Sequence, residues 1–201
     1  MEGSYAARYF PHEVIGLANT RFLITEVPEN ANLMRNSLDT EPNFGITGRG
    51  TDSDFFPPSA YRGVFLPLLR QHPHNAIKFI IDLLNHSASW YSQQLWPYDK
   101  LEGVDEVEIK IPGSVILTQW GNHRLWNLYR GHTVGPYLLQ CTLMALEAWL
   151  LEICTSENVD IEQWLLKILR NSNSVMATAV VCSVCNAYPC LLYTSRSPRD
   201  S

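Results

Sequence analysis

The stretch PYLLQCTLMALEAWLLEIC, residues 136–154, decides the fold. Its leucines and isoleucine recur at three- and four-residue intervals, the spacing of one helical face: Leu139, Leu143, Leu146, Leu150 and Ile153. A neighbouring flank is apolar as well, with Leu138, Ala145 and Trp149. A helix that is apolar on most sides is buried on most sides. We therefore predict a central helix that begins at Pro136 and runs to about Cys154.

Two more helices are predicted after the central one, so residues 132–189 form a helical segment. Asp160 with Gln163 resembles a capping box, which satisfies free backbone groups at a helix start. The helix that follows carries one apolar face: Ile161, Trp164, Leu165, Ile168 and Leu169. Residues 171–174 end it, and an apolar helix follows over residues 175–188. With no partner after it, this last helix should leave an apolar face exposed.

Residues 58–103 are predicted to form a helical hairpin. Ser59 suits the N-cap of a first helix, whose buried face would carry Tyr61, Val64, Phe65, Leu68 and Leu69. Pro67 should bend or shorten it. A second helix is predicted over residues 74–91, and its buried face would carry Ala76, Phe79, Ile80, Leu83, Leu84 and Ser87. The short link between the two helices favours antiparallel packing.

The hydrophobic period changes in residues 104–131, where a small antiparallel β-meander is predicted. VDEVEIKI, residues 104–111, alternates apolar and charged residues, which is typical of a half-exposed strand. VILTQW, residues 115–120, is a second strand. RLWNLY, residues 124–129, is expected as a third strand after the turn dipeptide Gly121-Asn122. Such a sheet is too small to be stable alone, so it should pack on the helices.

Residues 1–57 are predicted as an irregular N-terminal segment with one short helix, from Pro11 to Leu23. Residues 28–58 resemble a long loop, rich in Gly, Pro, Asp and Asn. A loop of this length is unusual in a compact domain, so missing parts of a larger protein would order it. The predicted fold is mainly α: helical hairpins or an irregular α-solenoid segment, with a small inserted antiparallel β-meander.

Composition excludes some partners. The chain of 201 residues has a net charge of −5, so it lacks the basic field that attracts nucleic-acid phosphates. No run approaches the ~20 consecutive apolar residues of a membrane span, and the N-terminus lacks the features of a signal peptide. We expect a cytoplasmic protein with reduced thiols and neither nucleic-acid nor membrane partners. Its low charge and six tryptophans fit either a surface that is covered by another part or a well-packed core.

Two short motifs resemble chemical sites without completing them. GITGRGT, residues 45–51, has the outer glycines of a phosphate-binding loop but lacks its Lys-Ser/Thr pair, so we predict a flexible loop. Cys182 and Cys185 form a C-x-x-C inside a predicted helix, whereas a structural zinc site needs four ligands. Two core thiols are expected there. No catalytic residue, cofactor-binding residue or metal ligand is assigned.

The stretch YRGH, between the meander and the central helix, is the best local candidate for a special site. We expect Arg130 either to pair with Glu147 or Glu152 or to contact a partner. Arg130, His132 and the nearby Trp126 are therefore our candidate contact site. The alternative is a structural arginine that is bonded by carbonyl groups and one carboxylate.

Three strings carry a resemblance to a known group of proteins: FFPPSAYRG (residues 55–63), LNHSASWY (residues 84–91) and LWNLYRGH (residues 125–132). Together they resemble the long helical region that follows the ATPase module in very large bacterial ATP-binding proteins. Such proteins are similar to signal-transduction NTPases with C-terminal helical arrays. The resemblance covers about residues 10–189. It implies that ATP binds in a part of the parent protein that is missing here, since the ATPase motif is not in this sequence.

The last twelve residues, 190–201, are predicted to be a non-native tail. CLLYTS, residues 190–195, is what the mosaic-end adapter of sequencing libraries encodes, and RSPRD differs from the usual continuation of that adapter by one codon change. Adapter-derived residues must be set aside before fold reasoning. We expect the natural sequence to stop near Pro189, inside a larger gene, and the tail to remain unpacked.

Two functions from different classes remain open. The first is a helical scaffold or sensor segment of a large multidomain bacterial NTPase, without activity of its own. Its partners would be the missing domains of the parent protein or other proteins. The second is a small free-standing α+β enzyme with a pocket beside the meander. A deep pocket with convergent titratable groups would favour the enzyme, whereas exposed apolar faces would favour the scaffold.

Overall fold

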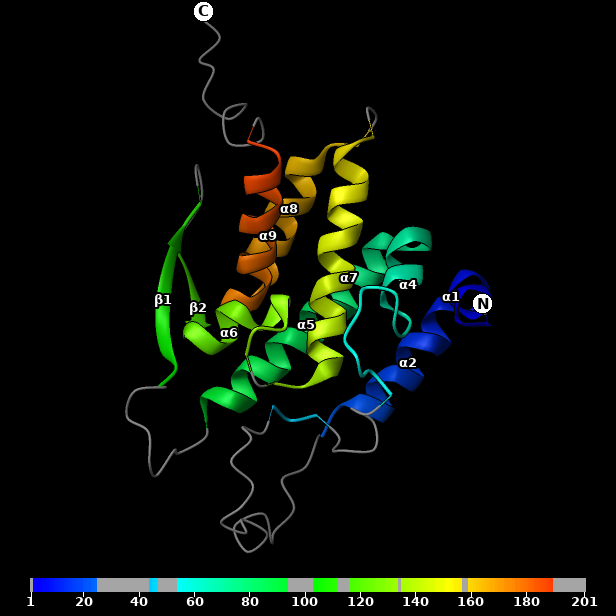
Figure 1. Cartoon of the computed structure of the whole chain (residues 1–201), viewed down its shortest axis with the longest axis horizontal. Coiled ribbons are helices and arrows are strands. Elements are labelled where there is room, and N and C mark those ends of the chain that lie inside the picture. The colour runs from blue at the N-terminus through cyan, green and yellow to red at the C-terminus, as the bar shows by residue number, and fades with distance from the viewer. Residues whose placement is uncertain are drawn as a thin grey trace, which may run out of the picture.

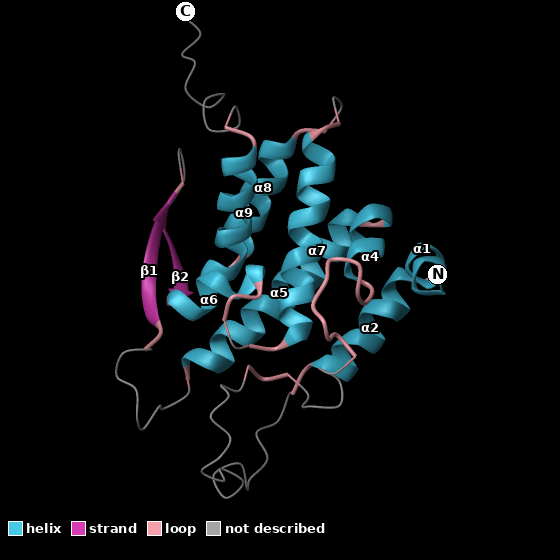
Figure 2. Ribbon diagram, in the orientation of Figure 1, coloured by secondary structure: helices cyan, strands magenta, loops and turns pink. Residues whose placement is uncertain are grey.

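The computed structural model describes residues 2–24, 44–46, 54–93, 103–111, 116–133, 135–156 and 159–189. Helices dominate, and a two-stranded antiparallel sheet lies at one side (Figures 1 and 2). The predicted class, mainly α with a small inserted β element, is confirmed. The element order is α1 (Glu2–Tyr9), α2 (Pro11–Phe22), α4 (Phe65–Gln71), α5 (Pro73–Ser92), β1 (Asp105–Lys110), β2 (Ile116–Gly121), α6 (His123–Asn127), the 3-10 helix η1 (Leu128–Arg130), α7 (Tyr137–Cys154), α8 (Ile161–Asn171) and α9 (Val175–Ala187).

Helix α7 is the predicted central helix. It lies between α4 and α9 and contacts both (Figure 1). The side chains of Leu139, Leu143, Leu146 and Leu150 are fully buried, whereas Ile153 is only partly buried near the end of the helix. Among the described helices, α7 alone is long and apolar enough to cross a membrane, with a mean hydropathy of 1.4, and in this fold it is the core helix.

Helices α8 and α9 begin where the sequence predicts. The Asp160 carboxylate caps α8 by accepting a hydrogen bond from the Gln163 amide at 3.3 Å. The Ser174 hydroxyl accepts from the Met176 amide at 3.2 Å and caps α9. The expected exposed face of α9 is wrong: most of its residues up to Val184 are buried against α6, α7 and α8. Its apolar sequence belongs to the core.

Helices α4 and α5 are the two helices of the predicted hairpin, and His72 alone separates them. Helix α4 begins at Phe65 rather than at Ser59, whose hydroxyl accepts a hydrogen bond from the Tyr61 amide instead. Proline suits the first turn, where a backbone N–H has no acceptor within the helix, so Pro67 marks the start of the helix. Tyr61 is consequently 75% exposed rather than buried. The predicted buried face of α5 is confirmed.

The predicted third strand, residues 124–129, is wrong: these residues form most of α6 and most of η1. The side chain of Asn122 accepts a hydrogen bond from the Leu125 amide at 2.8 Å, which caps a helix instead of closing a hairpin turn. The remaining sheet pairs β1 with β2, from Asp105 opposite Gly121 to Lys110 opposite Ile116. Strand β2 packs on α9, as expected of a sheet too small to stand alone.

Buried hydrogen bonds fasten β2 to the junction between α8 and α9. The Trp120 amide donates to the Asn173 carbonyl at 2.7 Å. Gln119, which is 1% exposed, donates to the Ser172 carbonyl at 3.1 Å and accepts from the Thr178 hydroxyl at 2.6 Å. The junction is held in turn by α5, because the amide of Asn173 donates to the Asn85 side chain. The sheet is therefore attached through polar contacts as well as apolar ones.

The N-terminal segment is more regular than predicted. Helix α1 was not expected, whereas α2 matches the predicted short helix. Parts of the long loop are in the core: Phe44 and Phe55 are buried, and the Phe44 ring stacks on that of Tyr91 at 4.6 Å. Most of the GITGRGT motif and the tail 190–201 lie outside the described residues, so the expectations for them stay predictions.

Candidate functional site

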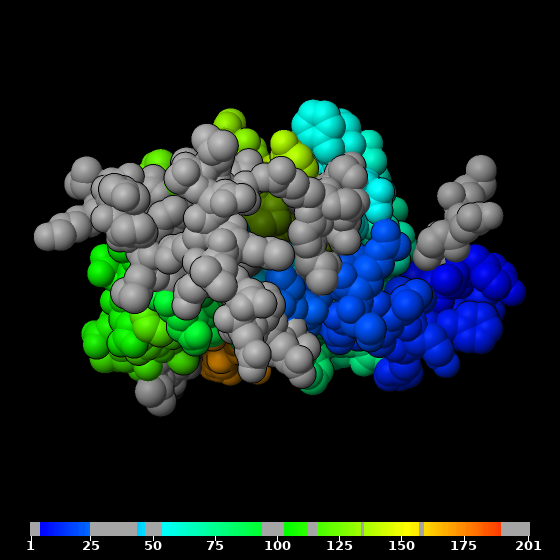
Figure 3. Space-filling model, turned by 90° about the horizontal axis from the view of Figure 1, so that it is seen from below, coloured from blue at the N-terminus to red at the C-terminus, as the bar shows by residue number. Residues whose placement is uncertain are grey.

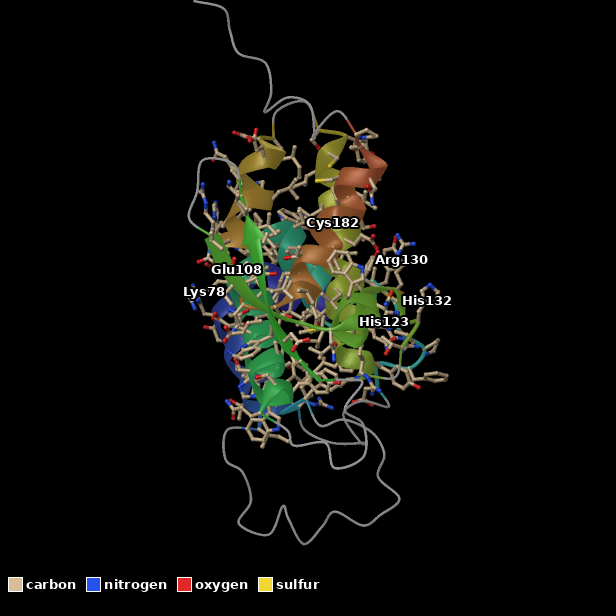
Figure 4. The ribbon with its side chains drawn as sticks, turned by 90° about the vertical axis from the view of Figure 1, so that its left-hand side faces the viewer. Lys78, Glu108, His123, Arg130, His132 and Cys182 are labelled. Carbon is tan, nitrogen blue, oxygen red and sulfur yellow. The ribbon has the colours of Figure 1, made fainter. Side chains whose placement is uncertain are left out.

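The predicted contact site lies where η1 leads into α7. Trp126 is on α6 and is 39% exposed, Arg130 ends η1, and His132 follows it; both of these side chains are exposed. Gly131 closes η1 with a left-handed φ of 67°, a conformation that glycine adopts without strain. Figure 4 shows Arg130, His132 and His123 on the same side of the molecule. The structure thus brings Arg130 and His132 to one surface.

Arg130 is held by two side chains. Its Nε donates to the Tyr129 hydroxyl at 2.7 Å, and its guanidinium carbon lies 5.0 Å from the centre of the Tyr129 ring. Another guanidinium nitrogen donates to the Ser183 hydroxyl at 3.2 Å, and this hydroxyl donates to Glu147. Arg130 therefore reaches Glu147 through Ser183 rather than by the direct ion pair that we considered.

The alternative carboxylate, Glu152, pairs with a different arginine. Arg70 on α4 donates through Nε to Glu152 on α7 at 2.9 Å, with a second contact between the same side chains. Hydrogen bonding to Glu152 raises the pKa of Arg70 above its usual value. The hydrogen bond to Tyr129 raises the pKa of Arg130 in the same way. Both guanidinium groups stay charged, and both tie surface elements to the core.

These contacts fix what the site can do chemically. Arg130 presents a positive charge in one orientation, linking η1 to α9 and, through Ser183, to α7. Such an arrangement suits recognition of a carboxylate or phosphate better than proton transfer, because arginine keeps its proton in proteins. The contacts fit a structural arginine, and the exposure of Arg130 also fits a contact residue.

A second cluster was missed by the sequence analysis. Lys167 Nζ lies 2.9 Å from His74 Nδ1 and 5.3 Å from the centre of the Trp164 ring. The His74 and Trp164 rings are 4.6 Å apart, and Trp149 packs edge-on against Trp164. The i, i+3 spacing of Trp164 and Lys167 was the available signal, but His74 lies 93 residues from Lys167 in sequence. His74, Trp164 and Lys167 line an open surface hollow of about 380 Å³ with Asp160.

The C-x-x-C pair is at the border of the core. Cys182 and Cys185 are half-buried free thiols on α9. Burial raises the pKa of both thiols, and for Cys185 the neighbouring Cys182 adds to the rise. A raised pKa lowers the thiolate fraction, so these cysteines are poor nucleophiles and poor metal ligands as they stand. In the part of the chain that the structure describes, no three His, Cys, Asp or Glu side chains converge as a metal site would require.

Large apolar side chains gather on α1 and α2, and we call this the α1–α2 surface. Its members are more than half exposed: Tyr5 66%, Tyr9 54%, Phe10 52% and Leu17 71%. The Tyr5 and Tyr9 rings are 4.6 Å apart. Phe10 is the N-cap residue between the two helices, and Leu17 lies on α2. Figure 3 shows the two helices together at one end of the molecule.

Comparison with protein-family models and with curated proteins found no relative of this chain. No protein-family model matches the sequence, and no curated protein matches it.

Proposed function

We propose that this chain is a helical interaction module that binds another protein part through its α1–α2 surface. The observation that carries the proposal is the exposure of four large apolar side chains on two consecutive helices and the residue that links them. Single exposed apolar residues are normal, whereas a contiguous group of them is typical of a contact surface. Two tyrosines and a phenylalanine add the aromatic character that is enriched at interfaces.

The finer proposal concerns the parent protein. We infer that the module belongs to a large multidomain bacterial NTPase and that its partners are other domains of that protein or separate proteins. Support comes from the resemblance of the three strings at residues 55–63, 84–91 and 125–132. ATP would bind outside this chain. In this setting the α1–α2 surface would lie against a neighbouring domain, and the core behind α7 would keep it rigid.

A free-standing enzyme would need a pocket beside the sheet. Two hollows among the described residues, of about 380 and 240 Å³, lie elsewhere: the smaller is at the start of α5, and the larger is between His74 and the start of α8. Both are open to solvent. His74 borders both hollows, and Lys167 and Asp160 border the larger one. No specific contact among the described residues favours the enzyme, so the interaction module is the function that the geometry supports best.

Sedimentation velocity of the chain at increasing concentration tests the proposal. With no partner present, the α1–α2 surface should drive reversible self-association at tens of micromolar concentrations. Replacing Phe10 and Leu17 with serine should abolish it. The matched control is Ile116→Ser, because Ile116 is 53% exposed but lies on β2. A monomeric wild-type chain, or association that survives Phe10→Ser/Leu17→Ser, would contradict the proposal.

A further inference from the structure

Strand β1 forms the outer edge of the sheet. Strand β2 contacts α9, whereas β1 lies outside β2 and away from the helices (Figure 1). Five of its six residues are exposed: Asp105, Glu106, Val107, Glu108 and Lys110. Among the described residues, β1 is paired on one side only. An edge strand directs half of its backbone N–H and C=O groups away from the sheet, where another strand can bind them.

The two faces of β1 differ in chemistry. A Cβ added to Gly121 would lie 2.8 Å from side-chain atoms of both Val107 and Val175, so the face that carries Val107 looks toward α9. Because side chains alternate along a strand, Glu106 and Glu108 project from the opposite face. Figure 4 views the side of the molecule that carries β1 and labels Glu108. The face toward α9 therefore carries Asp105, Val107 and Ile109, and the opposite face carries Glu106, Glu108 and Lys110.

A second copy of this chain fits the edge less well than a basic strand does, because at least one Glu of β1 would face another Glu in the two registers with the greatest overlap. When two copies of β1 pair antiparallel in one sheet, residues that face each other must project from the same face of that sheet. Because side chains alternate between the faces, two facing residues must both have even numbers or both have odd numbers. The register centred on Val107 places Glu106 opposite Glu108 at two positions. The register centred on Glu108 places Glu108 opposite its own copy and Glu106 opposite Lys110. Like charges directly opposite each other are destabilising. The same rule favours a strand with positive charges at those two positions.

We propose that the free edge of β1 binds an extended basic segment of another polypeptide, which adds to the sheet as a third strand. Lys or Arg in that segment lies opposite Glu106 and Glu108, and an apolar residue between them lies opposite Val107. Backbone hydrogen bonds provide affinity, and the alternate side chains provide selectivity. This surface is distinct from the α1–α2 surface, which lies at the opposite side of the molecule (Figure 1). The two proposals can therefore fail separately.

The test uses the whole chain and a labelled peptide, acetyl-Thr-Ile-Lys-Val-Lys-Ile-Thr-amide, whose symmetrical pattern matches β1 in either direction. Fluorescence anisotropy should detect saturable binding at low ionic strength, and added salt should weaken it. Amide hydrogen exchange should slow in β1 when the peptide binds. A peptide with Glu in place of Lys should not bind. A peptide with Pro in place of Val should bind at least about tenfold more weakly, because proline cannot join a ladder.

Charge reversal provides the matched comparison. Glu106→Lys/Glu108→Lys should lower affinity for the basic peptide at least about tenfold and create affinity for the acidic peptide. The control Glu13→Lys/Glu162→Lys makes the same change in net charge at exposed positions on α2 and α8, and it should bind the basic peptide like the wild type. The proposal fails if the two double variants bind equally, or if wild type binds the valine and proline peptides equally. Failure to bind any peptide at millimolar concentration would show that the charges of β1 protect a bare edge.

Discussion

Truncation of Leu146 to alanine is the sharpest test of the core around α7. Leu146 is fully buried on a helix that packs between α4 and α9. The substitution removes three carbon atoms, which at about 0.8 kcal/mol for each buried CH₂ gives roughly 2.4 kcal/mol of lost transfer free energy. The substitution also leaves a cavity, and the helices packed on both sides of α7 limit how far the core can collapse into it. The free energy of unfolding should therefore decrease by about 3–4 kcal/mol, within the usual 2–5 kcal/mol for Leu→Ala.

Urea unfolding followed by circular dichroism measures this change. With a slope of about 1–3 kcal/mol per molar urea, the midpoint should fall by more than about 1 M. The control is Leu17→Ala, which makes the same chemical change at a side chain that is 71% exposed. Its effect should stay within about 0.5 kcal/mol. Equal midpoints for the two variants would refute the placement of α7 in the core and of α2 at the surface.

Three further predictions concern single positions. Gly131→Ala should destabilise the fold by roughly 1–2 kcal/mol, because residue 131 has a left-handed φ. Gly16→Ala should stabilise it by roughly 0.5–1 kcal/mol, because Gly16 lies inside α2 with open space around it. Thermal unfolding midpoints that shift in the same direction for both variants would contradict this. Gln119→Ala should cost about 1–3 kcal/mol in urea, since it leaves buried polar partners unpaired, and a change under about 0.5 kcal/mol would count against this anchor. Because burial raises the pKa of Cys182 and Cys185, their thiolate fraction at a given pH is lower than that of an exposed cysteine. Alkylation of these thiols, followed by mass spectrometry, should be slow near neutral pH, accelerate above pH 9.0 and be faster in urea. Rapid labelling of the folded chain at neutral pH would refute this expectation.

Long apolar helices could be predicted because their signal is local and repeated. Helix α7 and the buried face of α5 follow from spacing alone, and Asp160 marks the start of α8 by its own side chain. Errors arose where one residue supports two structures. Asn122 is common in turns and at helix N-caps, and the choice depends on the Leu125 amide that it caps.

The side-chain contacts of the candidate site were harder to predict than its position. Tyr129 and Arg130 are neighbours in sequence, so an ordered surface there could be anticipated. Their link to Ser183 spans 53 residues and depends on how α9 packs against α7. Local patterns contain no information on such pairs. The same reason explains why the contact between Lys167 and His74 was missed.

The hydrogen bonds between β2 and the α8–α9 junction impose an order on folding during synthesis. Gln119 bonds to residues that lie 53 and 59 positions later in the chain, so the ribosome delivers the sheet well before its anchor. An isolated two-stranded ribbon is marginally stable in water at best. Strands β1 and β2 should therefore remain open to proteases on the nascent chain until Thr178 has left the exit tunnel. Stalled chains of increasing length would show this as a loss of cleavage within the two strands only after α9 emerges.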